Sequence, residues 1–340
     1  NGILIFGTNK FSSQLESSKE FSKIFMKRNN IPTARFKSFS DFNKALKYVR
    51  ESDFPLVVKA DGLAAGKGVR VCTKFSEAEE FLKFVMLDKI FSVSGEKVVI
   101  EEFLEGEEAS FFVFTDGKSI LPLDSSQDHK RLLDDDMGPN TGGMGAYSPA
   151  PIVDEETRKN IMKDIVEPVF AGFKKEKINY TGVLYIGLMI KNKKSRVVEF
   201  NCRFGDPETQ PLLYRLDSDA FDLFFMTAEV KLDEYELKWK DKSSITVVMA
   251  AKGYPGKYET GLPVKGIQGF QKEDVEIFHA GTANIQGETV INGGRVLGVT
   301  AEAPTLKEAI SLVYTAISEL DSTNLVYRKD IGKKGLSKIS

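Results

Sequence analysis

Val197-Val198-Glu199-Phe200-Asn201-Cys202-Arg203-Phe204-Gly205-Asp206-Pro207-Glu208 is the stretch of sequence that decides the fold. Its apolar start leads into a carboxylate, an amide and a guanidinium at alternate positions. An extended backbone therefore places Glu199, Asn201 and Arg203 on one face of a strand. Carboxylate and amide oxygens suit a hard cation such as magnesium, and an arginine suits an anion that the cation also contacts. We predict a magnesium–phosphate site at the end of this strand.

A simpler interpretation of the same residues is a salt-bridged strand end in which Arg203 neutralises Glu199. The apolar approach through Val197 and Val198 makes an uncompensated carboxylate costly, so some cation must lie near Glu199. If Arg203 were that cation, it would not be free to bind phosphate. Both interpretations stay open at this point.

Composition limits the class of protein. The 340 residues allow two or three domains, and 47 basic residues nearly balance 49 acidic ones. Neither a nucleic-acid surface nor an acidic tail is indicated. Cys72 and Cys202 are too few for a disulfide framework, which favours a reducing compartment. No apolar run approaches the ~18 residues of a membrane span, and the first residues do not form a signal peptide. We expect a cytoplasmic enzyme without nucleic-acid or membrane partners, and a monomer.

Periodicity predicts a mixture of helices and strands. Helices are expected at 15–29, 40–51, 76–87, 154–176, 211–216, 220–228 and 305–320, with Ser76 and Glu79 forming a capping box. Strands are expected at 54–59, 97–103, 109–115, 118–123, 180–190, 196–200, 245–251, 275–282, 289–292 and 295–301. Residues 125–151 show little periodicity, and a loop of this length is usually functional or disordered. Its residue types favour function.

A glycine-rich flap follows the first of these strands, at Gly62, Gly66, Lys67 and Gly68. Its spacing is not that of a Walker A loop, and a strand follows it, so it is not a dinucleotide fingerprint. Glycines nevertheless let backbone N–H groups close over phosphate oxygens, and Lys67 and Lys59 would bring positive charge to them. The alternative is a surface hairpin with incidental lysines.

Two further segments are candidates for binding. In the acidic run 101–108, most carboxylates are expected to be solvated, but one could hold a ribose and the backbone near Phe103 and Leu104 could meet an adenine edge. The glycine-rich loop 138–147 suits close approach to a small polar substrate, with a flexible linker as the alternative. His129 and His279 are expected to be structural rather than catalytic.

Together these motifs resemble the ATP-grasp ligases. Within them, three stretches are similar to the phosphoribosylamine–glycine ligase (glycinamide ribonucleotide synthetase) family: Gln127-Asp128-His129-Lys130-Arg131, Gly138-Pro139-Asn140-Thr141-Gly142-Gly143-Met144-Gly145-Ala146-Tyr147 and Glu199–Glu208. The resemblance implies an α+β fold in which two α+β subdomains clamp ATP, followed by a smaller C-terminal mixed β domain with a helix. We expect the start of the central domain at 1–30, a lid subdomain at 31–105, the central catalytic subdomain at 106–235, the C-terminal domain at 236–332 and a disordered tail at 333–340.

The family reaction joins glycine to 5-phosphoribosylamine through glycyl phosphate, giving glycinamide ribonucleotide, ADP and phosphate in the second step of de novo purine biosynthesis. The resemblance implies ATP and Mg²⁺ (or Mn²⁺), with Glu199 and Asn201 as metal ligands. It implies ATP contacts from Lys19, Lys59, Gly62, Gly66, Lys67, Gly68, Glu101, Glu102, Phe103, Leu104 and Glu108. The implied substrate-binding residues are Asp128, Asn140, Thr141, Gly142, Gly143, Arg203 and Asp206, and Arg203, Lys67 and Asp206 are the implied catalytic residues.

Two features depart from the family pattern. The strand that precedes the Glu199 strand carries no carboxylate to complete the metal shell. Family members also begin with an additional nucleotide-fold domain, and Asn1 corresponds to a point after it, so the chain is expected to be a fragment or to have lost that domain. Two alternatives therefore stay open: another ATP-dependent carboxylate–amine ligase, and a nucleotide-binding module without turnover.

Overall fold

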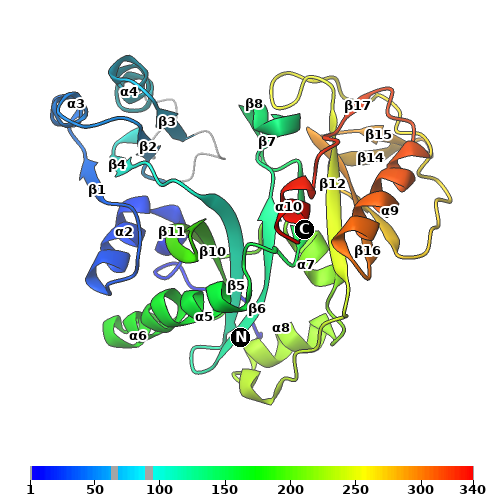
Figure 1. Ribbon diagram of the computed structural model, residues 1–340, viewed down its shortest axis with the longest axis horizontal. Helices are drawn as coiled ribbons and strands as arrows, with labels where there is room; N and C mark the ends of the chain where they lie inside the picture. Colours follow the sequence, from blue (N-terminus) through cyan, green and yellow to red (C-terminus); the bar gives the residue numbers. More distant parts are fainter. Residues whose placement is uncertain (1, 63–67, 89–94, 340) are drawn as a thin grey trace.

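The structure is a computed structural model that describes residues 2–62, 68–88 and 95–339. Two sheets dominate it: a four-stranded sheet of order β1-β4-β2-β3, and a nine-stranded sheet of order β11-β10-β5-β6-β9-β12-β16-β13 in which β17 pairs with β12. Figure 1 shows the small sheet and its helices at one end of the molecule and the C-terminal elements at the other. The α+β fold expected from the sequence is confirmed.

The small sheet and two helices form a unit with its own core, in the region predicted as the lid. Its core is a cluster of apolar side chains between residues 45 and 100, including Val58, Phe81 and Ile100. The elements are β1 Phe36–Phe39, α3 Phe42–Arg50, β2 Leu56–Ala60, β3 Val69–Cys72, α4 Phe75–Leu82 with a π-helical turn Lys83–Leu87, and β4 Val98–Glu102.

The start of α4 differs from the prediction. Lys74 is the N-cap and its side chain makes no capping bond, so the capping box expected at Ser76 and Glu79 is wrong. The carboxylate of Glu77 instead accepts hydrogen bonds from the backbone N–H (2.8 Å) and hydroxyl (3.0 Å) of Thr73. The helix therefore begins before Ser76, because an acid in its first turn reaches back to the preceding strand end.

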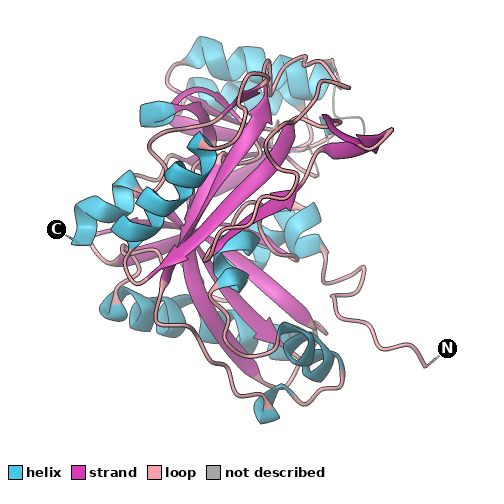
Figure 2. Ribbon diagram, turned by 90° about the vertical axis from the view of Figure 1, so that its right-hand side faces the viewer, coloured by secondary structure: helices cyan, strands magenta, loops and turns pink. Residues whose placement is uncertain are grey.

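The central part is built on the long antiparallel strands β5, β6, β10 and β11 with helices packed on them (Figure 2). Ser18 divides the expected helix 15–29 into α1 and α2, since its backbone is extended and its side chain caps α2. The elements are α1 Gln14–Ser17, α2 Lys19–Arg28, β5 Glu107–Thr115, β6 Ile120–Asp128, α5 Glu155–Ile161, a π-helical turn Met162–Val166, α6 Glu167–Glu176, β10 Gly182–Lys191, β11 Lys194–Asn201, α7 Thr209–Tyr214, α8 Ala220–Ala228 and a 3₁₀ turn Leu232–Glu234.

Residues 125–151 are ordered, which corrects the expectation of a structureless loop. They form the end of β6, the hairpin β7 Arg131–Leu133 and β8 Met137–Asn140 with a 3₁₀ turn Asp134–Asp136, and β9 Gly145–Ser148. Strand β9 pairs with β6 on one side and β12 on the other. A Cβ at Gly145 would lie 2.7 Å from the carbonyl oxygen of Thr246, so glycine permits this close pairing.

The C-terminal part packs α9 on the strands β12 and β16 around its own apolar cluster, which also takes in Tyr147. Its elements are β12 Ser243–Ala251, β13 Val275–His279, β14 Thr282–Ile285, β15 Glu288–Ile291, β16 Arg295–Ala303, α9 Leu306–Ser318, β17 Leu325–Val326 and α10 Lys333–Ile339. Helix α10 corrects the expected disordered tail at 333–340, because Gly335 packs closely against Tyr147 and Leu306. The other domain limits remain a prediction.

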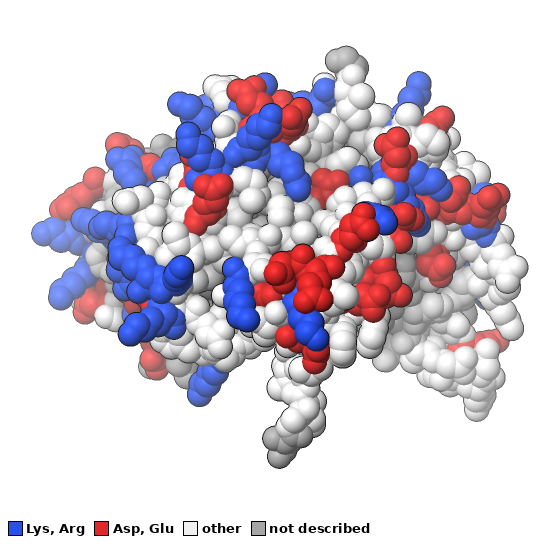
Figure 3. Space-filling view, turned by 90° about the horizontal axis from the view of Figure 1, so that it is seen from below, with Lys and Arg blue, Asp and Glu red and all other residues white. Residues whose placement is uncertain are grey.

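On the face shown in Figure 3, acidic and basic side chains are mixed, in keeping with the net charge of −2. No helix in the described ranges 2–62, 68–88 and 95–339 is long and apolar enough to cross a membrane.

Candidate active site

Glu199 lies near the end of β11, and three lysines surround it. It faces Gly187 of β10, whose lack of a side chain leaves room for it. Burial alone would raise the pKa of Glu199, but Lys130, Lys59 and Lys19 outweigh burial and lower it, with a further contribution from Asn201. The carboxylate is therefore ionised, and the positive charges of these three lysines stabilise it.

Arg203 makes its ion pair elsewhere. Its Nε lies 3.1 Å from Oε1 of Glu16, and the other oxygen of Glu16 accepts the backbone N–H of Cys202 at 2.8 Å. Nη2 of Arg203 lies 3.4 Å from Oδ1 of Asn201. The interpretation in which Arg203 neutralises Glu199 is therefore not supported, because lysines supply the compensating charge.

The residues at the end of β11 fit a magnesium ion that is shared with a ligand. Glu199 and Asn201 offer an ionised carboxylate and an amide oxygen from alternate positions of one strand. Among the described residues, no group of three or more His, Cys, Asp or Glu could hold a metal by itself. Magnesium commonly takes one or two protein oxygens and completes its shell with water and phosphate, so a two-donor site is sufficient.

The lysines that are predicted to bind phosphate come from α2, β2 and the flap. Ser18 and the backbone N–H of Glu20, at the start of α2, hydrogen bond to Asp61. Next to them Nζ of Lys19 lies 3.4 Å from the carbonyl of Gly62, so Lys19 stands at the entrance of the predicted flap. At the far end of the flap, the carbonyl of Gly68 accepts a hydrogen bond from the backbone N–H of Ala60 at 2.7 Å. Gly66 and Lys67 lie outside the described residues.

Lys59 is buried and points at the same place. Its Nζ lies 3.0 Å from Oε1 of Glu101 and 3.3 Å from the carbonyl oxygen of Val198, which immediately precedes Glu199. The ammonium group carries three donors, so these contacts do not exhaust its capacity to bind an anion.

The predicted adenine hinge begins at the end of β4. Glu102 accepts the backbone N–H (2.9 Å) and Nε–H (2.6 Å) of Arg35 and also bonds to Arg196 of β11. Burial would raise the pKa of Glu102, but these bonds outweigh it and lower the pKa to about 2. Since the side chains of Glu101 and Glu102 are both paired, an adenine at this hinge would meet the backbone. Leu104 is buried, while Phe103 is 39% exposed.

A second polar cluster lies where β5 and β6 meet the turn before α7. Lys130 forms an ion pair with Glu108, the predicted ribose ligand. Glu208 is buried and accepts the hydroxyl of Tyr185 at 3.0 Å. Burial first, and then Glu208 and Glu108, raise the pKa of Asp128 to about 7, while Lys130 acts in the opposite direction. Lys130 thus connects Glu108 and Asp128 electrostatically with Glu199.

The predicted substrate loop is held by its own backbone. Thr141 donates both its N–H (2.7 Å) and its hydroxyl (2.9 Å) to the carbonyl of Lys130, and its hydroxyl accepts the N–H of Gly143 at 3.0 Å. At Gly143 φ is +116°, and a Cβ would lie 2.4 Å from Cδ of Pro207. Glycine is therefore required where this loop passes the Asp206–Pro207 turn.

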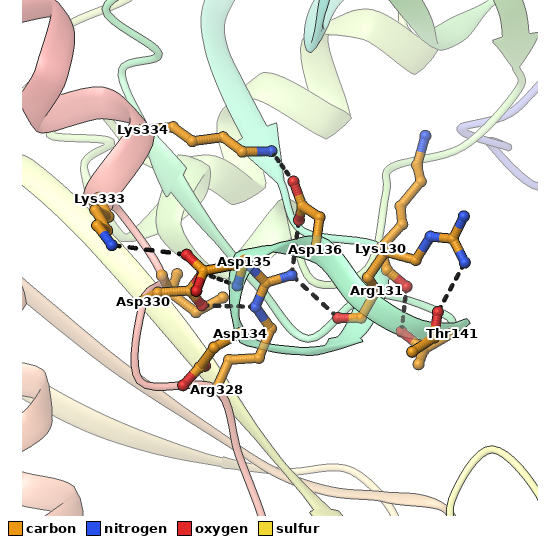
Figure 4. Close-up of polar contacts among 12 residues, drawn as sticks. Lys130, Arg131, Asp134, Asp135, Asp136, Thr141, Arg328, Asp330, Lys333 and Lys334 are labelled. Atoms are coloured by element: carbon orange, nitrogen blue, oxygen red, sulfur yellow. Dashed lines mark hydrogen bonds and ion pairs between the residues drawn. The ribbon is translucent and has the colours of Figure 1, made fainter.

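Below this loop, the buried Arg328 anchors the β7–β8 hairpin. Its guanidinium bonds to Asp136 (2.9 Å), to the carbonyl of Arg131 (3.1 Å) and to both carboxylate oxygens of Asp330 (2.7 Å each). Figure 4 shows Arg328 between these groups, with Lys130 and Thr141 at the other end of the hairpin. The C-terminal segment thereby holds the β7–β8 hairpin that leads into Asn140 and Thr141.

Arg295 and Tyr254 are site residues that the sequence reasoning missed. Arg295 donates to the carbonyl of Gly142 (2.8 Å) and pairs with Asp206 (2.8 Å), and the hydroxyl of Tyr254 accepts the N–H of Gly142 at 2.9 Å. A groove of about 670 Å³ lies beside this loop, lined in part by Asn140 and Tyr254. The only sequence signal was an arginine directly after Gly293-Gly294.

The two histidines stay outside the candidate chemistry. His129 is buried against Tyr147, with ring centroids 5.9 Å apart. His279 is exposed, and its Nδ1 lies 3.0 Å from the hydroxyl of Thr282.

Comparisons with known proteins place this site in a family. Residues 17–209 match the model of the phosphoribosylglycinamide synthetase ATP-grasp (A) domain, and residues 244–334 match that of the phosphoribosylglycinamide synthetase C domain. Phosphoribosylamine–glycine ligases of Vibrio vulnificus and Escherichia coli are 48% and 47% identical, each over 99% of this chain and 79% of the relative.

Solved structures agree. The phosphoribosylamine–glycine ligase of Thermotoga maritima superposes with a TM-score of 0.87 at 34% identity, over 96% of this chain and 81% of that one. The biotin carboxylase domain of Hydrogenobacter thermophilus 2-oxoglutarate carboxylase, solved with MgADP and bicarbonate, shares the fold with a TM-score of 0.76 at 16% identity, over 96% and 70% of the two chains. The fold and the matches define an ATP-grasp carbon–nitrogen ligase. The chain belongs to the phosphoribosylglycinamide synthetase family of purine biosynthesis.

Proposed function

We propose that this chain ligates glycine to 5-phosphoribosylamine at the expense of ATP, giving glycinamide ribonucleotide, ADP and phosphate. One observation supports the proposal beyond family membership: Lys19 of α2, Lys59 of β2 and Lys130, between β6 and β7, all lower the pKa of Glu199. An ionised acid among several lysines is the electrostatic setting that a metal-bound polyphosphate requires.

We assign ATP to the space between the lid and β11. Lys19 and Lys59 contact its phosphates, and the flap with Gly62, Gly66, Lys67 and Gly68 closes over them. The backbone from Glu101 to Leu104 binds adenine. Glu108 binds the ribose, and its ion pair with Lys130 weakens as it does so. The paired side chains of Glu101 and Glu102 support a hinge that acts through its backbone.

Glu199 and Asn201 would hold the metal, Mg²⁺ or Mn²⁺, which would supply positive charge to neutralise the phosphates during transfer. Arg203 and Lys67 stabilise the phosphoryl group in transfer. Arg203 is already oriented for this by Glu16 and reaches Asn201 without neutralising Glu199.

The loop Asn140–Gly143 and Asp206 form the wall against which glycine and phosphoribosylamine bind. A carboxylate oxygen of glycine attacks the γ-phosphorus and ADP leaves. The amine nitrogen of phosphoribosylamine then attacks the carbonyl carbon of glycyl phosphate, phosphate leaves, and the nitrogen loses a proton. The pKa of about 7 at Asp128 suits a group that takes this proton near neutral pH.

The test is ADP release in a coupled assay with each substrate omitted in turn. We expect release to require both glycine and phosphoribosylamine. Equal release with bicarbonate or another acid in place of glycine would identify a different ATP-grasp carboxylate-activating enzyme. A rise in melting temperature with Mg-ATP, but no turnover with any substrate, would identify a nucleotide-binding module.

Monomeric action in the cytoplasm, with small molecules as the only partners, belongs to the same proposal. Light scattering after size-exclusion chromatography tests the monomer.

A further inference from the structure

A lysine without any role in the site described above lies buried behind it. Nζ of Lys23 on α2 lies 2.9 Å from Oε2 of Glu101, while Nζ of Lys59 lies 3.0 Å from Oε1 of the same carboxylate. Only 2% of Lys23 is exposed, and Lys59 and Glu101 are each 4% exposed. Each oxygen of the Glu101 carboxylate thus contacts one buried ammonium group.

The charge count of this triad is unusual for a protein interior. Two cations and one anion leave the triad with a net charge of +1 that faces the ionised Glu199 of β11, and burying so many charges is costly. Burial, followed by repulsion from Lys59, lowers the pKa of Lys23, while Glu101 raises it, and the balance is about 8. A further hydrogen bond to the hydroxyl of Thr33, 2.7 Å long, fixes the ammonium group of Lys23 in place. Such a costly arrangement fits a site that is completed by an anionic ligand.

Lys23 and Lys59 have different access to that ligand. Lys23 contacts Glu101 and Thr33, whose hydroxyl bonds to the carbonyl of Val197, whereas Lys59 lies against the carbonyl of Val198, directly before Glu199. Without Lys23, Glu101 would be left with Lys59 as its counter-ion, and the positive charge of Lys59 would be cancelled inside the protein.

We propose that Lys23 is a positioning residue for ATP: by neutralising Glu101, it leaves the charge of Lys59 available to the polyphosphate. This inference rests on the proposed function, in which Lys59 binds phosphate. It extends that function to a residue that does not touch the nucleotide, and it predicts an effect of charge rather than of shape.

The experiment compares the affinities for Mg-ATP and for adenosine by calorimetry in Lys23→Met, Glu101→Gln, and the double variant. For Lys23→Met we expect Mg-ATP binding to weaken by about 10- to 100-fold, the range of a lost charged interaction, with adenosine binding unchanged. The double variant restores the net charge of +1, so its Mg-ATP affinity should return to within about threefold of wild type. Lys27→Met, at an exposed position of the same helix, is the matched control and should bind like wild type.

The inference is overturned if Lys23→Met binds Mg-ATP with wild-type affinity. It is also overturned if Lys23→Met and the double variant bind Mg-ATP equally weakly. If Lys23→Met does not fold, Glu101→Gln alone decides: a net charge of +2 should tighten Mg-ATP binding, and weaker binding would overturn the idea. Lys59→Met distinguishes a failure of the proposed function from a failure of the inference about Lys23. If Lys59→Met binds Mg-ATP like wild type, Lys59 does not bind phosphate and that part of the proposed function is wrong. If Lys59→Met loses Mg-ATP affinity but Lys23→Met does not, only the inference about Lys23 is wrong.

Discussion

Arg295 holds Asp206 by two separate bonds, Nη2 to the carboxylate Oδ2 and Nη1 to the backbone carbonyl, each 2.8 Å long. Nη1 also bonds to the carbonyl of Gly142, again at 2.8 Å. A guanidinium from β16 therefore joins the turn after β11 to the predicted substrate loop. A planar group with several fixed donors can do this, and an ammonium group cannot reproduce it.

We expect Arg295→Met to lower kcat/KM for glycine and phosphoribosylamine by about 10- to 100-fold, as befits the loss of charged hydrogen bonds. ATP affinity should not change, because Arg295 lies on the substrate side of the site. Steady-state kinetics with each substrate varied measure both effects. Arg295→Lys should be intermediate, and an Arg295→Met enzyme with wild-type kcat/KM would remove Arg295 from the site.

Glu199→Gln should abolish magnesium-dependent turnover while leaving the fold intact. The amide keeps the shape of the side chain but loses the charge that the surrounding lysines balance, so we expect kcat to fall by about 1,000-fold or more. Magnesium titrations of ADP release, with melting curves alongside, measure the change. Glu105→Gln, at an exposed acid, is the control and should behave like wild type. If Glu199→Gln keeps wild-type kcat, the metal assignment is wrong.

Thr141→Val tests whether the shape of the substrate loop matters. The valine side chain is similar in size but can neither donate to the carbonyl of Lys130 nor accept from Gly143, while the backbone N–H bond to Lys130 remains. Each such bond contributes about 1 kcal/mol, so we expect kcat/KM for glycine to fall roughly tenfold. Thr141→Ser keeps the hydroxyl and should stay close to wild type. Equal kinetics in the two variants would show that the hydroxyl does not order the loop.

The candidate site residues could be named from the sequence because they stand in long local motifs, and their roles remain a prediction. Glu199 and Asn201 are two positions apart on one strand, so their common face follows from backbone geometry alone. Most helices and strands followed from periodicity in the same way. The turn at Asn192-Lys193 between β10 and β11 lies where it was expected.

The structural features that could not be predicted depend on contacts between segments that are distant in the chain. Strand β9 was predicted as loop because residues 125–151 show little periodicity, yet the backbone of Thr246 requires glycine at Gly145. Helix α10 was read as a disordered tail because its packing partner, Tyr147, is far away in the chain. Arg295 and Lys23 were missed for the same reason: an arginine or lysine alone carries no local signal of its partner.

His129 makes the stability of the protein depend on pH in a direction that can be calculated. Burial, and secondarily the nearby Arg328, lowers the pKa of His129 from 6.5 to about 4. The unfolded chain therefore takes up the proton first as the pH falls. The stability contributed by neutral His129 is complete above pH 6.5 and is lost progressively down to pH 4.

We expect this loss to reach about 2 kcal/mol at pH 5, from the linkage between protonation and unfolding. His129→Phe keeps a ring against Tyr147 but cannot take up a proton, so its free energy of unfolding should fall less between pH 7 and pH 5 than that of wild type. The raised pKa of Asp128 acts in the opposite direction, since ionising that carboxyl costs stability as the pH rises, but it is common to both proteins and cancels. Urea unfolding at the two pH values measures the difference, with His279→Phe as the exposed control. An equal loss in wild type and His129→Phe would mean that His129 does not resist protonation in the folded protein.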